Sequence, residues 1–263
     1  MKKAIFFDID GTLIECFGGI VDMSEKVKNA IYSLQKKGHY VFIATGRPYA
    51  FLSQAILDFG FDGFILANGA QVMLNNEIIH SEYIDKGFLN DLVEEFEELN
   101  IQYILQDKKY SYLKEEFKEF YNFFESVNVS TNLFIRDYVF EDINAYKIEM
   151  LCPNEEVANT CLEIVKRNED YDYVSSIDAK SFELYSKKNT KATAILKVLE
   201  HLDIDIKNSY AFGDGKNDIE MLSTVGCGIA MGNASDEVKK YAKEITDTVF
   251  NDGVAVGIEK FIL

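Results

Sequence analysis

The sequence predicts an α/β protein with a Rossmann-like parallel sheet core and an inserted α+β domain. Three observations predict this fold. Apolar runs alternate with amphipathic helical segments at both ends of the chain, the middle of the chain lacks that alternation, and an acidic motif follows an apolar run near each end. Continuous apolar runs are typical of parallel strands that helices cover on both faces.

The N-terminal part of the chain alternates strand and helix signals. We expect apolar strands at residues 3–8, 40–44 and 64–67. Between the first two strands, apolar residues recur at helical spacing after Ser24, which is suited to cap the helix, and Gly38 is suited to end it. A second helix is expected from Pro48, because proline fits the first helical turn.

The middle of the chain is expected to form a separate α+β domain. The expected elements are a helix at 86–99, a hairpin at 101–113, a helix at 114–126, a strand at 145–151, a helix at 155–167 and a strand at 171–177. Alternation resumes with a helix at 191–202, a strand at 208–213, a helix at 217–224 and a strand at 228–230. The predicted core is therefore residues 1–83 and 181–263, and the predicted insertion is residues 84–180.

Composition restricts the possible partners. The 263 residues carry a formal net charge of −17, which argues against binding to nucleic acid or to an anionic membrane surface. Asp8 and Asp10 interrupt the first apolar run, and no stretch approaches the roughly 18 apolar residues of a membrane span. The four cysteines show no CxxC spacing. We expect a cytoplasmic protein, for which a small phosphorylated substrate remains possible.

Two acidic motifs carry the chemistry. Asp8 and Asp10 follow the first apolar strand in FFDIDGTL, and Asp214 and Asp218 follow a later strand in AFGDGKNDIEML. Ligands of open α/β sheets bind at the carboxyl ends of the strands. Carboxylates brought together at such an edge would hold a hard cation such as Mg²⁺.

The first motif also offers a nucleophile. Asp8 is placed to attack a phosphorus atom and form an aspartyl-phosphate, and Asp10 to act as general acid and base. Gly11 permits a tight turn, within which Thr12 is expected to hydrogen-bond. The alternative interpretation of this motif is an ordinary polar turn.

Four further residues are suited to bind a phosphate group. Thr45 and the amide of Gly46 lie at a strand end before a helix start, where they can donate to a phosphate oxygen. Lys191 can offset negative charge, and Asn217 can donate a hydrogen bond. Each of these residues has an alternative interpretation when it is taken alone: Thr45 also fits a helix cap, and Lys191 also fits a solvated surface residue.

Together these motifs resemble the haloacid dehalogenase superfamily, and within it the Cof-type phosphatases with a class IIB cap. The matching segments are FFDIDGTL, ATGR, Lys191 in KATA, GDGKNDIEML, AMGNA at 230–234 and NDGVA at 251–255. The chain departs from this pattern at Ala192, where relatives commonly carry glycine.

The resemblance implies a role for each motif residue. Asp8 would be the nucleophile and Asp10 the general acid and base. Mg²⁺ would be held by Asp8, the Asp10 backbone carbonyl and Asp214, with support from Asp218. The residues implied in phosphate and substrate binding are Thr45, Gly46, Arg47, Lys191 and Asn217.

The resemblance also implies a Mg²⁺-dependent phosphatase that acts on small phosphorylated metabolites, sugar phosphates foremost, with the insertion selecting the substrate. We expect a monomer or a weak homodimer. A sugar phosphomutase that uses the same nucleophile remains the main alternative. A receiver-like signalling module and a non-catalytic binding protein are less favoured, because Asp10 is present and no motif residue is missing.

Overall fold

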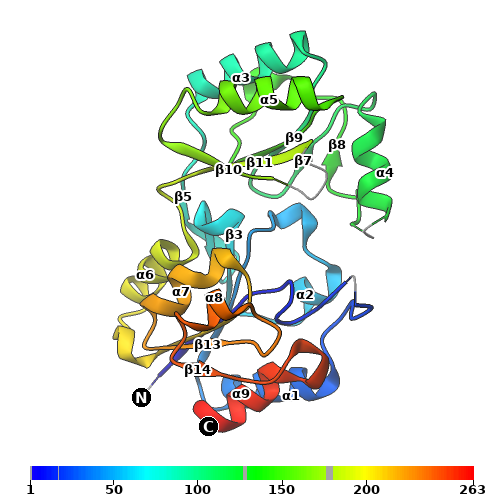
Figure 1. The fold of residues 1–263 in the computed structure, drawn as a ribbon. Helices are drawn as coiled ribbons and strands as arrows, with labels where there is room; N and C mark the ends of the chain where they lie inside the picture. Colours follow the sequence, from blue (N-terminus) through cyan, green and yellow to red (C-terminus); the bar gives the residue numbers. More distant parts are fainter. Residues whose placement is uncertain (1, 17, 127–128, 176–179) are drawn as a thin grey trace. The chain divides into compact units, whose positions relative to one another are not determined.

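The computed structural model describes residues 2–16, 18–126, 129–175 and 180–263 (Figure 1). The chain divides into two compact units. The core unit consists of Met1–Gly46, Gln54–His80 and Thr190–Leu263. The inserted unit consists of Arg47–Ser53 and Ser81–Asn189.

The core unit is built on an eight-stranded sheet with the order β14-β13-β12-β1-β2-β3-β4-β5. The strands are β1 (Ala4–Phe7), β2 (Tyr40–Ala44), β3 (Gly63–Leu66), β4 (Gln71–Leu74), β5 (Glu77–Ser81), β12 (Ser209–Gly213), β13 (Cys227–Ala230) and β14 (Glu244–Ile245). The strands from β14 to β3 pair in parallel, and β4 pairs antiparallel with β3. This sheet confirms the predicted α/β fold class.

The central strand β1 is buried on both faces of the sheet. Because successive side chains of a strand point to opposite faces, Phe6 and Phe7 enter different layers. The Phe6 ring stacks on Phe42 at 5.1 Å, and the Phe7 ring stacks on Phe212 at 5.2 Å. Apolar packing on both faces explains why the sequence of β1 is a continuous apolar run.

Helices cover both faces of this sheet. They are α1 (Glu25–Lys36), α2 (Gln54–Asp58), α6 (Lys191–His201), α7 (Ile219–Thr224), α8 (Asp236–Lys239) and α9 (Gly253–Phe261). Residues of α6 and α7 share a hydrophobic cluster with Phe6 and Phe42. On the other face, α1 packs against α9, in which Gly257 lies close to the Phe212 ring (Figure 1).

Local signals set the starts of two of these helices. The Ser24 side chain accepts a hydrogen bond from the backbone N–H of Val27, as predicted for the cap of α1. Thr190 caps α6 and forms a reciprocal capping box with Thr193. Lys191 is therefore the first residue of α6.

Two parts of the core sequence fold differently from the prediction. The helix predicted from Pro48 is wrong at its start, because Tyr49–Phe51 form a 3₁₀ turn and α2 begins only at Gln54. The antiparallel strands β4 and β5 were not predicted. Because β5 is exposed along most of its length, it lacks the continuous apolar run from which the other strands were predicted.

The inserted unit is built on a six-stranded sheet with the order β10-β11-β9-β6-β7-β8. Its elements are α3 (Lys86–Glu98), β6 (Gln102–Gln106), β7 (Ser111–Tyr112), α4 (Lys118–Ser126), β8 (Phe134–Ile135), β9 (Lys147–Leu151), α5 (Glu155–Val165), β10 (Tyr171–Ser175) and β11 (Ser181–Ser186). Helices α3 and α5 pack on one face of this sheet, where they share a hydrophobic cluster with side chains of β6, β9 and β11.

The sequence predicted most of the inserted unit but not all of it. The hairpin of β6 and β7 is confirmed, as are α3 and α5, whereas β8 and β11 were not predicted. The predicted strand at 171–177 is observed as β10 up to Ser175, and its last two residues lie outside the described residues. Among the described residues, no helix has the length and apolar character that a membrane crossing requires.

Replacement of Leu199 by alanine should destabilise the core unit by about 2–5 kcal/mol, because Leu199 is 4 % exposed and its loss leaves a cavity between α6 and the sheet. Leu196 on the same helix is 44 % exposed, so Leu196→Ala is the matched control and should cost less than about 1 kcal/mol. Urea denaturation measures the free energy of unfolding of both variants. Equal costs would contradict the packing described for α6.

Candidate active site

The site is built at the carboxyl ends of the adjacent strands β1 and β12. The Asp8 backbone N–H donates to Phe212 O at 3.0 Å, which continues the parallel ladder one residue beyond β1. Asp214 follows directly after β12. Pairing of these strands therefore brings together two motifs that lie more than two hundred residues apart in the sequence.

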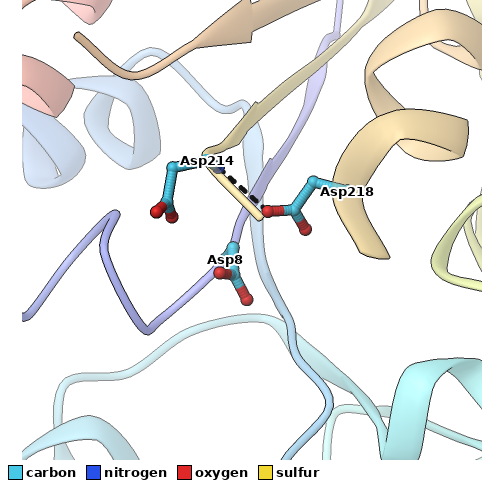
Figure 2. Close-up of side chains that lie close together, drawn as sticks. All are labelled: Asp8, Asp214 and Asp218. Carbon is cyan, nitrogen blue, oxygen red and sulfur yellow. Dashed lines mark hydrogen bonds between the residues drawn. The ribbon is translucent and has the colours of Figure 1, made fainter. Parts of the chain in front are cut away.

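Asp218 holds the loop that follows β12. Its Oδ2 accepts hydrogen bonds from the backbone N–H groups of Asp214 and Gly215, both at 2.9 Å (Figure 2). Gly213 leaves the room for this, because a Cβ there would lie 2.6 Å from the Asp218 carboxyl carbon. Asp218 is fully buried, so its carboxylate fixes the position of Asp214 from inside the protein.

Lys191 lies between two buried carboxylates. Its Nζ donates to Asp8 Oδ1 at 2.7 Å and to Asp218 Oδ1 at 2.6 Å. The side-chain exposures of Lys191, Asp8 and Asp218 are 0 %, 7 % and 0 %. Buried charges of this kind persist only when they are paired and hydrogen-bonded.

Asp214 is oriented by two further side chains. Thr12 Oγ1 donates to Asp214 Oδ1 at 3.0 Å, and Asn233 Nδ2 lies 3.3 Å from Asp214 Oδ2. Asn233 Nδ2 also donates to Gly11 O at 2.8 Å. Gly11 has a φ of +79°, and a Cβ there would collide with the Asp214 carboxylate, so only glycine fits this position.

The carboxylates form a group that fits a divalent cation. Asp8, Asp214 and Asp218 each offer an oxygen, and these three atoms lie within 4.8 Å of one another (Figure 2). Hard divalent cations prefer such oxygen ligands. Asp218 is fully buried and accepts three hydrogen bonds from nitrogen donors, whereas Asp214 is partly exposed. Asp8 and Asp214 are therefore better suited as direct ligands and Asp218 as their support.

The electrostatics of the site disfavour the ionised form of Asp8. Burial raises the pKa of the Asp8 carboxyl to about 8; the Asp218 carboxylate also raises it, while Lys191 lowers it. Burial likewise raises the pKa of Asp214 to about 6, against the lowering effect of the hydrogen bond from Thr12. For Lys191, the carboxylates of Asp218 and Asp8 outweigh burial and raise the pKa above its usual value.

The Thr45 loop lies in the same unit. The Thr45 backbone is fixed by hydrogen bonds to Ile65 O at 2.9 Å and from the Asn68 N–H at 3.1 Å. Asn217 Nδ2 donates to Asn68 Oδ1 at 3.1 Å, and the Asn68 side chain lies beside Gly46. Asn68 therefore links the predicted phosphate-binding residues Thr45, Gly46 and Asn217.

The remaining predicted residues differ in their surroundings. Asp10 follows Asp8 on the exposed side of the β1 end and forms an isolated bridge with Ile14. Arg47 belongs to the inserted unit, whereas its neighbour Gly46 belongs to the core unit.

Sequence reasoning missed three contacts of the site. The Thr12 backbone N–H donates to Ile9 O at 3.2 Å, as expected of a hydrogen bond within the turn, but the donation of its side chain to Asp214 was not predicted. Asn68 and Asn233 were given no role. The AMGNA segment contains Asn233 and was the available signal for it, whereas the link of Asn68 to Asn217 depends on tertiary structure.

An α/β core with carboxylates and a buried lysine at its strand ends, together with an inserted α+β unit, defines the class of enzymes that transfer phosphoryl groups by way of an acidic site. The family model described as "haloacid dehalogenase-like hydrolase" matches residues 5–258, and the chain belongs to this family. It is a phosphatase that acts on phosphorylated substrates.

Individual relatives agree with this family. The chain is 30 % identical to the Bacillus subtilis protein named "Putative phosphatase YkrA", over 98 % of this chain and 97 % of the relative. It is 29 % identical to "5-amino-6-(5-phospho-D-ribitylamino)uracil phosphatase YcsE" of the same organism, over 99 % and 96 %.

Solved structures share the fold. A protein of Geobacillus kaustophilus superposes with a TM-score of 0.88 at 29 % identity, over 99 % of this chain and 98 % of that one. The HAD subclass IIB sugar phosphatase BT4131 superposes with a TM-score of 0.81 at 24 % identity, over 99 % of both chains. At that identity the second comparison supports the fold alone.

In metal-free protein, the free energy of unfolding should fall as the pH rises from about 4 to about 8. The raised pKa of Asp8 means that the folded state keeps a proton which the unfolded state has released, so stability is highest below the unfolded pKa and is lost as the pH rises. Urea denaturation with a chelator present measures this dependence.

The control is Asp8→Asn, which cannot titrate. It should reduce the fall and leave the part caused by the other carboxyls whose pKa values burial raises, namely Asp214, Glu149, Asp62 and Asp107. A wild-type stability that rises over the same range would contradict the electrostatics described for the site.

Proposed function

We propose that the protein is a Mg²⁺-dependent phosphatase that hydrolyses small phosphorylated metabolites through an aspartyl-phosphate on Asp8. The observation that carries the proposal is the cluster of Asp8, Asp214 and Asp218, held together by Lys191. Phosphoryl transfer depends mainly on positioning and on neutralisation of charge, and this arrangement supplies both.

In the proposed reaction, Asp8 attacks the phosphorus atom in line with the leaving oxygen. Asp10 protonates the departing alkoxide and then removes a proton from the water that hydrolyses the aspartyl-phosphate. Lys191 holds Asp8 Oδ1 at 2.7 Å, which limits rotation of the carboxylate and directs it out of the strand end. The rigid support of Lys191 by Asp218 favours the same orientation throughout the reaction.

The metal and phosphate sites follow from the same residues. Mg²⁺ would be held by Asp8, the Asp10 backbone carbonyl and Asp214, with Asp218 in support; when bound, it would neutralise charge on the phosphate and favour ionised Asp8. The proposed phosphate-binding residues are Thr45, Gly46, Arg47, Lys191 and Asn217. Asn68 supports this part of the proposal, because it contacts Thr45, Gly46 and Asn217.

We assign substrate selection to the inserted unit, which would act as the cap. Sugar phosphates and related polyol phosphates are the proposed substrates, supported by the name of the relative YcsE, a 5-amino-6-(5-phospho-D-ribitylamino)uracil phosphatase. The expectations of a cytoplasmic monomer or weak homodimer that binds neither nucleic acid nor membrane stay predictions from the sequence.

A panel of phosphorylated metabolites tests the function. Phosphate release should require Mg²⁺ and should be abolished by Asp8→Asn, because the amide is too weak a nucleophile to form the acyl-phosphate. Formation of a sugar phosphate isomer without free phosphate would instead identify a phosphomutase. Appreciable phosphatase activity in the Asp8→Asn protein would exclude Asp8 as the nucleophile.

Asp10→Asn should lower kcat on the order of a hundredfold, because the amide cannot carry a proton to the leaving group or from the water. With para-nitrophenyl phosphate, whose leaving group needs little protonation, the variant should release one equivalent of nitrophenolate rapidly and then turn over slowly. Stopped-flow absorbance measures the burst. Unchanged steady-state turnover would remove Asp10 from the proposed mechanism.

A further inference from the structure

The segment Arg47–Ser53 follows the Thr45 loop in the chain but packs in the inserted unit. The chain therefore passes between the units at four places, namely residues 46/47, 53/54, 80/81 and 189/190. A simple insertion needs only two such passages. The additional two, at 46/47 and 53/54, bound the segment that directly follows Thr45 and Gly46, which are proposed to bind phosphate.

Aromatic contacts anchor this segment in the inserted unit. The Phe51 ring lies 5.0 Å from the Phe124 ring and 5.8 Å from the Phe134 ring, measured between centroids. Ala50 is buried in the same hydrophobic cluster, which also contains Ile104, Leu113 and Phe120. Tyr49 lies under Lys109, whose Nζ is 5.7 Å from the ring centroid. Each residue of the 3₁₀ turn thus contacts other parts of the inserted unit.

A hydrogen bond connects this anchor to Arg47. The Arg47 Nη1 donates to Phe51 O at 3.1 Å, within the same turn. The backbone carbonyl that orients the guanidinium belongs to the residue whose ring is held by Phe124 and Phe134. One of the contacts that hold the Arg47 side chain therefore comes from the residue whose ring packs on Phe124 and Phe134.

Resting on the function proposed above, we propose that Phe51 is a positioning residue for phosphate binding, which acts by holding Arg47 through its backbone carbonyl. Loss of the ring frees the turn, and the guanidinium then has to be ordered when phosphate binds. Arg47 is the group that contacts the phosphate, and Phe51 acts only through it. The segment Arg47–Ser53 thereby contributes to phosphate affinity.

The experiment is a double-mutant cycle with Phe51→Ala, Arg47→Ala and the double variant. The dissociation constant of inorganic phosphate is measured by calorimetry with Mg²⁺ present, and kcat and KM are measured with para-nitrophenyl phosphate. Phe51→Ala should raise both the dissociation constant and KM on the order of tenfold while kcat changes less. In the Arg47→Ala background, Phe51→Ala should have no further effect.

Two control variants separate positioning from packing. Phe120→Ala removes a ring from the same cluster, where it stacks on Phe124 at 5.8 Å, and should leave phosphate affinity unchanged while lowering stability. Phe51→Leu keeps apolar bulk in the cluster and should restore most of the affinity.

Three results would overturn the inference: additive effects of Phe51→Ala and Arg47→Ala, an equal loss of affinity in Phe120→Ala, or wild-type affinity in Phe51→Ala. If the wild-type protein hydrolyses the ester with Mg²⁺, any of these three results leaves the proposed function intact. A wild-type protein that neither binds phosphate nor releases it from the metabolite panel contradicts the proposed function itself.

Discussion

The ion pairs of Lys191 are the constraint on which the site depends. One buried ammonium joins two buried carboxylates from different parts of the chain, Asp8 after β1 and Asp218 before α7. Loss of one partner of a buried ion pair costs about 3–5 kcal/mol, because the remaining charge is left without compensation. Lys191 therefore stabilises the strand ends that carry the proposed catalytic residues, and its ion pairs join the start of α6 to the sheet.

Several local features secure this lysine and its partners. The capping box of Thr190 and Thr193 sets where α6 begins. Lys191 is therefore the first residue of this helix, and it is buried. Gly213 leaves space for the Asp218 carboxylate, and the backbone N–H groups after β12 donate to it. These interactions share one requirement: polar groups buried at the strand ends must all find partners. The side chains of the site are consequently held by hydrogen bonds within the core unit, and the proposed catalysis requires such preorganisation.

The sequence predicted the elements and residues that local sequence patterns determine, and it missed the features that tertiary contacts determine. Strand β2, the Ser24 cap and the helices α3, α5 and α6 follow from apolar periodicity and cap chemistry. The motif residues Asp8, Asp214 and Asp218 were named from their positions at strand ends, and the structure brings them together. The Phe51 turn was mistaken for a helix, because its conformation is set by rings more than seventy residues away in the sequence. The contact between Asn233 and Asp214 likewise joins loops that no local pattern relates.

The charge balance of the site explains how a strongly acidic protein can bind a phosphate ester. Its three carboxylates outnumber the single buried ammonium, and the pKa of Asp8, raised to about 8, shows that Lys191 alone does not compensate them. The metal-free site therefore disfavours the ionised form of Asp8, which is the form that the proposed attack on phosphorus requires. Metal ligands must be deprotonated to bind, so a divalent cation favours the ionised nucleophile. In the proposed mechanism, binding of the cation and ionisation of Asp8 would thus be one coupled equilibrium, and the cation together with Lys191 would make the site locally attractive to phosphate despite the net charge of −17.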